Sequence, residues 1–162
     1  MTEQKQQEAT TMTEHWPNGR VREIRRGVNG KRHGRQQVWY EGGRPRYDHS
    51  YEHGVEHGRQ QGWYENGQPW YDQNYERGEK HGRQRRWYSG GQPKYDSNYE
   101  HGQQHGRQQA WHEDGRPWYD SNYEHGTEYG REAAAGIETP TSSHTTSDAK
   151  QATQQSDDRR PA

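Results

Sequence analysis

The 162-residue sequence contains no cysteine, no phenylalanine and no leucine. Without cysteine the chain can form no disulfide and offers no thiolate nucleophile. Hydrophobic residues make up only 22% of the chain, and the larger aliphatic ones are four valines and two isoleucines. An ordinary aliphatic core is therefore excluded. No apolar run reaches the length of a signal-peptide core or a membrane span, so we expect a soluble, cytoplasmic protein.

Aromatic residues and balanced charge are what the chain has instead. Twelve tyrosines and seven tryptophans separate it from the compositions typical of disordered chains, which are poor in aromatic side chains. The 23 basic and 24 acidic residues give a formal net charge of −1. Such a balance provides no long-range field that would attract a nucleic acid or an anionic membrane.

A repeat of 24 residues organises the sequence. Residues 34–57 read GRQQVWYEGGRPRYDHSYEHGVEH, and the next 24 residues read GRQQGWYENGQPWYDQNYERGEKH. The full copies follow one another without a gap, at residues 34–57, 58–81, 82–105 and 106–129. Self-similarity at a fixed short period is typical of repeat proteins, in which each unit contacts its neighbours along the chain.

The boundaries of this repeat domain follow from where the pattern fades. Residues 15–33 align in the same register as a partial, capping copy, and we predict a repeat domain over residues 15–131. Residues 1–14 are polar, and residues 132–162 are rich in Ser, Thr and Gln. Both segments are predicted to be disordered tails.

Two glycine turns recur in each full repeat. Gly42-Gly43 fits a two-residue hairpin turn of type I′, and His53-Gly54 closes the next hairpin. Pro45 follows the first turn, and the segments between turns lack an apolar stripe of helical period, which excludes a helical repeat. We therefore predict an all-β fold in which tandem hairpins form an elongated, twisted, antiparallel single-layer sheet of about nine or ten strands.

Strand lengths predict a bulge in every repeat. Residues 55–65 between two turns number eleven, whereas residues 44–52 before them number nine, so two residues must be left out of the pairing. His57-Gly58 is the expected place, because glycine adopts the backbone angles of a bulge. The glycines assigned to turns or bulges are Gly43, Gly54, Gly58, Gly67, Gly78, Gly82, Gly91, Gly102, Gly106, Gly115 and Gly126.

Side-chain alternation predicts what the two faces carry. With a two-residue first turn, Trp39 lies opposite Arg46 and Trp63 lies opposite Trp70 on one face, while the other face carries a ladder of tyrosines. Alternation alone leaves open whether the sheet is a ribbon or a trough whose tyrosine face closes on itself. The candidate binding residues are Trp39, Arg46, Trp63, Trp70, Trp87, Lys94, Trp111 and Trp118. Trp70 and Trp118 are the favoured pair, with cross-strand packing as the alternative role.

Residues 34–58 carry the pattern Gly-x-x-x-x-Trp-Tyr-x-x-Gly-x-x-x-Tyr-x-x-x-Tyr-x-x-Gly-x-x-x-Gly. This pattern resembles the MORN repeat, and in particular its variant in bacterial antitoxin-type proteins and large DNA viruses. The resemblance implies stacked hairpins and a non-enzymatic scaffold for protein–protein interaction, with an antitoxin-like role or, in a virus, a role in the host-cell cytoplasm. The 24-residue period and the proline after the first turn depart from the usual pattern of the family.

Other functions are weighed against the same residues. Carboxylates recur as regularly as the arginines and would repel phosphate, which argues against nucleic-acid binding. The repeats are nearly identical, whereas an active site needs an asymmetric set of residues, so no enzyme is expected. Successive His57, His81 and His105 would lie about 9.5 Å apart, too far to share one ion, so neither a metal nor a cofactor is expected. The partner is expected to be another protein. A platform for glycans or lipid headgroups is the alternative, and self-association through the last strand, near residues 123–131, stays open.

Overall fold

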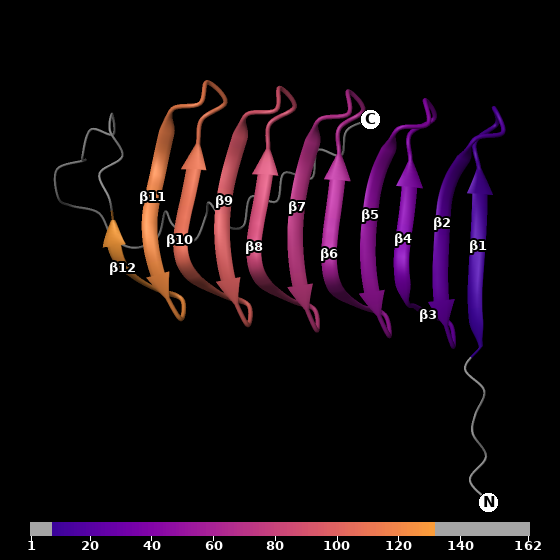
Figure 1. Ribbon diagram of the computed structural model, residues 1–162, viewed down its shortest axis with the longest axis horizontal. Helices are drawn as coiled ribbons and strands as arrows, with labels where there is room; N and C mark the ends of the chain where they lie inside the picture. The colour runs from indigo at the N-terminus through magenta and orange to yellow at the C-terminus, as the bar shows by residue number, and fades with distance from the viewer. Residues whose placement is uncertain (1–7, 132–162) are drawn as a thin grey trace, which may run out of the picture.

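The computed structural model describes residues 8–131, which form one antiparallel sheet of twelve strands (Figure 1). The strands are β1 (Ala9–His15), β2 (Val21–Val28), β3 (Lys31–Arg32), β4 (Gly34–Trp39), β5 (Pro45–Glu52), β6 (Val55–Trp63), β7 (Pro69–Glu76), β8 (Glu79–Trp87), β9 (Pro93–Glu100), β10 (Gln103–Trp111), β11 (Pro117–Glu124) and β12 (Thr127–Arg131). They lie side by side in chain order, and the short β3 pairs with β2 beside this path. The predicted all-β hairpin fold is confirmed.

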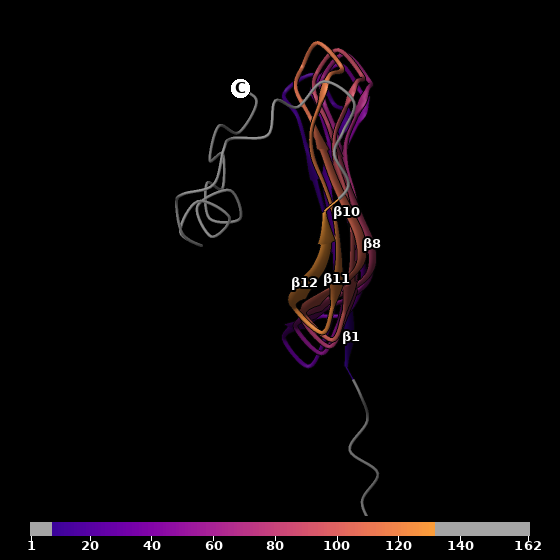
Figure 2. The same cartoon turned by 90° about the vertical axis from the view of Figure 1, so that its left-hand side faces the viewer.

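The sheet is open and one layer thick. Strands β1 and β12 lie at opposite edges, and the edge-on view in Figure 2 shows a thin, bowed layer. The tyrosine face therefore does not close on itself, which decides between the two shapes that alternation left open. Among residues 8–131 no helix is long and apolar enough to cross a membrane.

The N-terminal boundary differs from the sequence prediction. Residues Ala9–His15 form strand β1, which pairs with β2 from Ala9 opposite Val28 to His15 opposite Val21. The predicted disordered tail over residues 1–14 is therefore wrong from Ala9 onward, and the partial repeat at 15–33 is completed by an edge strand. Threonines favour this strand, and β2 supplies the hydrogen-bonding partner. Residues 1–7 and 132–162, where the rest of the predicted tails falls, lie outside the described residues.

The first turn of each repeat is a three-residue loop. The Gly43 N–H donates to the Tyr40 carbonyl at 2.8 Å, and the Tyr40 N–H donates to the Arg44 carbonyl at 2.9 Å. Gly43 has a φ of 90°, but Gly42 is not among the glycines of positive φ. The prediction of a type I′ turn here is wrong: a type I turn followed by one left-handed residue needs glycine only at its last position. The same bonds recur at Gly67, Gly91 and Gly115.

The second turn has two residues, as the sequence predicted. His53 has a φ of 50° and Gly54 a φ of 90°, and the flanking Glu52 and Val55 are paired. Positive φ at both central residues is the signature of a type I′ hairpin. Equivalent turns follow at Arg77-Gly78, His101-Gly102 and His125-Gly126.

The bulge absorbs two residues at the predicted place. Tyr51 pairs with Glu56 and His49 pairs with Gln60, so residues 57–59 lie opposite Ser50 alone. Gly58, in the middle of these three, has a φ of 81°. The same interruption recurs between β7 and β8 and between β9 and β10.

Candidate functional site

A buried glutamine stabilises the bulge at the start of each full repeat. The Gln36 side chain donates to the Arg26 carbonyl at 2.7 Å and accepts from the Arg26 N–H at 3.0 Å, so it takes the place of a neighbouring backbone. Gln60 and Gln84, each 1% exposed, donate in the same way to the carbonyls of residues 50 and 74. Sequence reasoning missed this role. The signal was the Gly-Arg-Gln triplet that opens every full repeat.

The tyrosine face is the side of the sheet on which β5, β7, β9 and β11 each carry two tyrosines, which form two rows across the strands. Its members include Tyr47, Tyr71, Tyr95, Tyr119, Tyr51, Tyr75, Tyr99 and Tyr123. A third row, before the first turn, joins successive repeats through hydrogen bonds to the next repeat. Tyr40, Tyr64 and Tyr88 donate from their hydroxyls to the carbonyls of Trp63, Trp87 and Trp111 at 2.9, 2.9 and 3.0 Å. Trp16 donates from its indole to the Trp39 carbonyl at 3.2 Å, so the first hairpin uses the same link.

The predicted cross-strand pairs are not formed. Trp39 pairs with Pro45, and Trp63, Trp87 and Trp111 likewise pair with the prolines at 69, 93 and 117. The extra loop residue and the bulge beside it place Arg46 on the tyrosine face. Its guanidinium lies 5.3 Å from the ring centre of Tyr40 and 5.1 Å from that of Tyr47.

The equivalent residues of the other repeats lie on the same face. We call Arg46, Trp70, Lys94 and Trp118 the variable row, because this position alternates between a cation and tryptophan. Trp70 contacts Tyr64 and Tyr71 with ring centres 6.0 and 4.9 Å apart, and the Lys94 ammonium lies 5.4 Å from the ring centre of Tyr88. Trp118 is 42% exposed and lies 5.9 Å from Tyr119.

The opposite side, which we call the tryptophan face, carries Trp39, Trp63, Trp87 and Trp111 and a row of ion pairs. The pairs are Arg35–Asp48, Arg59–Asp72, Arg83–Asp96 and Arg107–Asp120. Hydrogen bonds from Arg59 hold the pKa of Asp72 below its usual value, against the opposing effect of burial. Each arginine of this row is thus engaged by a carboxylate, so the row does not offer phosphate a line of unpaired cations.

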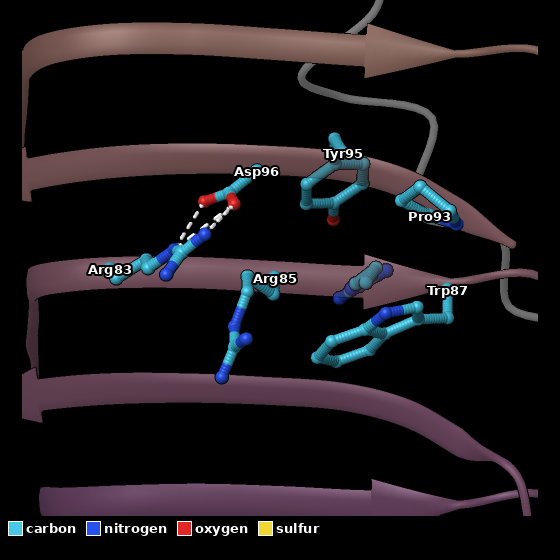
Figure 3. A pocket seen from close by; sticks show the side chains of 7 residues that line it. Arg83, Arg85, Trp87, Pro93, Tyr95 and Asp96 are labelled. Atoms are coloured by element: carbon cyan, nitrogen blue, oxygen red, sulfur yellow. Dashed lines mark hydrogen bonds and ion pairs between the residues drawn. The ribbon is translucent and has the colours of Figure 1, made fainter. Parts of the chain in front are cut away.

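A hollow of about 190 Å³ lies beside one of these ion pairs (Figure 3). Arg83 and Asp96 are hydrogen-bonded to each other at one end of it, and Trp87 and Pro93 lie at the other end. Arg85 stacks 5.1 Å from the Trp87 ring centre and also pairs with a carboxylate of β7 at 2.8 Å. Of the three arginines that line the hollow, two are thus paired with carboxylates, and the third, Arg86, lies 5.6 Å from the ring centre of Tyr95.

His49 is a half-buried histidine of the tyrosine face. His49 Nε2 lies 2.5 Å from the Tyr71 hydroxyl, between the two tyrosines of its own strand. Burial lowers the pKa of His49 and raises that of Tyr71, because desolvation disfavours the charged form of each. Both groups are therefore held neutral at physiological pH, and their contact is a hydrogen bond between neutral partners.

Comparison with protein families gives a match to the MORN repeat variant. Residues 56–77 and 80–101 match the model of the MORN repeat variant, and their starts are separated by the 24-residue period. A comparison with curated proteins gives no match. The matched segments cover two central hairpin units of the sheet, and the hairpins before and after them have glycine turns of the same backbone geometry. The chain therefore contains two tandem repeats of the MORN variant type, at residues 56–77 and 80–101.

Proposed function

We propose that the protein is a non-enzymatic repeat scaffold that binds another protein through its tyrosine face, with the variable row as the main contact. The observation that carries this proposal is the position of the variable row. It lies on a face that no second layer covers within residues 8–131, among tyrosines that are ordered by bonds between repeats.

The fold itself does not require a particular residue in the variable row. The pairing around Arg46 and around Trp70 has the same register, with Val38 opposite Tyr47 in one repeat and Gly62 opposite Tyr71 in the next. A cation and a tryptophan are thus accommodated by one backbone. Positions that vary on a constant framework are those that a scaffold can use for recognition.

The chemistry of the row indicates the kind of partner. Trp and Arg are the side chains most enriched among residues that dominate protein–protein binding energy. Arg46 and Lys94 are suited to carboxylates, whereas Trp70 and Trp118 are suited to apolar pockets. Residues one repeat apart lie two strand spacings apart, about 9.5 Å, so we expect a partner that alternates acidic and apolar groups at this spacing.

The test compares the two faces. The wild-type chain is used to isolate a partner from the source cells, and its Kd for the purified partner is then measured for each variant. We expect the double variant Trp70→Thr and Trp118→Thr to bind at least tenfold more weakly with an unchanged far-UV circular dichroism spectrum. The control is Trp63→Thr with Trp111→Thr on the tryptophan face, which should keep the wild-type Kd. Unchanged binding by the first double variant, or loss of its β spectrum, would contradict the proposal.

A further inference from the structure

Histidines lie close together at the end of the strands where the second turns are found, the lower end in Figure 1. There β7 ends, β8 begins and the β9–β10 turn lies. His81 belongs to the bulge of β8, and His101 to the turn after β9. Their ring centres are 5.2 Å apart, and Glu76 Oε2 at the end of β7 lies 3.7 Å from His81 Nδ1. One ligand atom from each of the three residues falls within 4.8 Å of the others.

The same cluster forms again one repeat later. Glu100, His105 and His125 also bring their ligand atoms within 4.8 Å of one another. The ring centres of the two histidines are 5.3 Å apart, and Glu100 Oε2 lies 3.6 Å from His105 Nδ1. No metal was expected because equivalent histidines of successive repeats lie too far apart. The structure instead brings the bulge histidine together with the histidine of the second turn 20 residues further on.

The hydrogen bonding of the bulge histidine's Nδ1 atom differs between the repeats that have such a cluster and those that do not. His33 Nδ1 and His57 Nδ1 accept the backbone N–H of His53 and Arg77 at 3.4 Å. The Nδ1 atoms of His81 and His105 are buried and have no hydrogen-bond partner within residues 8–131. A buried polar nitrogen without a partner costs free energy, and coordination of a cation would satisfy it.

We propose that each cluster binds one Zn²⁺ ion through a glutamate oxygen and two imidazole nitrogens, with water in the remaining position. Imidazole and carboxylate are the ligands that zinc takes at about 2.0–2.2 Å, which places neighbouring ligand atoms roughly 3.4 Å apart in a tetrahedral site. The clusters must therefore contract. The side chains of Glu76 and His81 are 42% and 41% exposed, so rotation of these side chains achieves this without moving the strands.

Zinc would act as a clamp between repeats. The ligands of the first site come from β7, β8 and the β9–β10 turn, so one ion connects the β7–β8 hairpin with the β9–β10 hairpin beside it. A repeat protein is stabilised mainly by contacts between neighbouring units. An ion that binds only the folded state adds to this stability according to its concentration and Kd. The two sites lie one repeat apart and have separate ligands, so we expect independent binding.

The chain supplies its own matched variants. In the repeat before the first cluster, Glu52 and His57 are present but Arg77 occupies the position of His101, with the same left-handed turn geometry. His101→Arg and His125→Arg therefore remove one ligand from each site and keep a residue that this turn accepts. Conversely, Arg77→His would complete a third site. His53→Arg is the control, because Val28 stands where that cluster would need its carboxylate.

The experiment is isothermal titration of the untagged, EDTA-treated full chain with ZnCl₂ at pH 7.5, together with a thermal melt at each ratio. We expect two ions per chain and a rise in Tm, one ion for each single variant, and at least a tenfold loss of affinity in the His101→Arg, His125→Arg double variant. The Arg77→His variant should bind three ions, and His53→Arg should still bind two. Absence of binding, or a stoichiometry that the double variant leaves unchanged, would overturn the proposal.

Discussion

Replacing Gln36 with methionine tests whether the buried glutamines stabilise the bulges. Methionine is similar to glutamine in length, so the change removes the amide group without opening a large cavity. Gln36 is 7% exposed and makes both bonds to the backbone of one residue, donating to the Arg26 carbonyl at 2.7 Å and accepting from the Arg26 N–H at 3.0 Å. Gln36→Met therefore leaves the Arg26 N–H without a partner, and it removes one of two bonds to the Arg26 carbonyl, which still accepts the His33 N–H at 3.0 Å.

The size of the effect follows from these two bonds. A buried donor that loses its only partner costs about 1–3 kcal/mol, so we expect the free energy of unfolding to fall by about 2 kcal/mol. At about 4 °C per kcal/mol, Tm should fall by about 8 °C. Gln84 makes only the donor half of the arrangement, at 2.7 Å to the Asn74 carbonyl, so Gln84→Met should cost less, about 1 kcal/mol.

The matched control is the next residue of the same strand. Gln37 points to the tryptophan face, is less buried, and bonds to Asp48 at 3.3 Å and to the Arg26 side chain at 3.4 Å. Gln37→Met should cost less than about 1 kcal/mol, because water can replace these longer bonds. Urea unfolding followed by circular dichroism measures all three variants. Equal losses for Gln36→Met and Gln37→Met would refute the role assigned to the buried row.

Three further substitutions test other contacts of the tyrosine face. Tyr64→Phe removes the 2.9 Å bond to the Trp87 carbonyl and should cost about 0.5–1.5 kcal/mol by urea unfolding, whereas no loss would show that the link between repeats is dispensable. Gly62→Ala would place a Cβ 2.4 Å from the buried ring of Tyr71, so we expect a loss of about 1–3 kcal/mol, and a Tm equal to wild type would contradict this. The lowered pKa of His49 means that the unfolded chain takes up a proton more readily below about pH 6.5, so stability falls as the pH decreases from there. His49→Gln should weaken this fall between pH 7.5 and 5.5, and an identical decrease of the urea midpoint in both proteins would exclude the explanation.

Features that depend on local sequence were predictable. The type I′ turn at His53-Gly54 needs positive φ at two adjacent residues, and few residue pairs other than those ending in glycine adopt it. The bulge at Gly58 follows from counting residues between turns, because paired strands must match in length. Both predictions needed no knowledge of which side chains meet.

Features that depend on pairing partners were not predictable from the same patterns. Strand β1 has no glycine turn before it and no aromatic residue of its own, and its order comes from hydrogen bonding to β2. The cluster of Glu76, His81 and His101 brings together the end of β7, the bulge of β8 and the β9–β10 turn. That the histidine of the bulge meets the histidine of this turn follows only from how the two neighbouring hairpins lie in the sheet.

The wrong first turn shows how one loop residue changes a functional assignment. Because successive side chains of a strand point to opposite faces, a shift of one residue moves a side chain across the sheet. The three-residue loop and its bulge thus moved Trp70 from a place opposite Trp63 to a place between Tyr64 and Tyr71. The alternative role considered for Trp70, cross-strand packing against Trp63, is therefore excluded. The tryptophans of the two faces can consequently be substituted separately, and binding lost from the tyrosine face alone would be a property of that face.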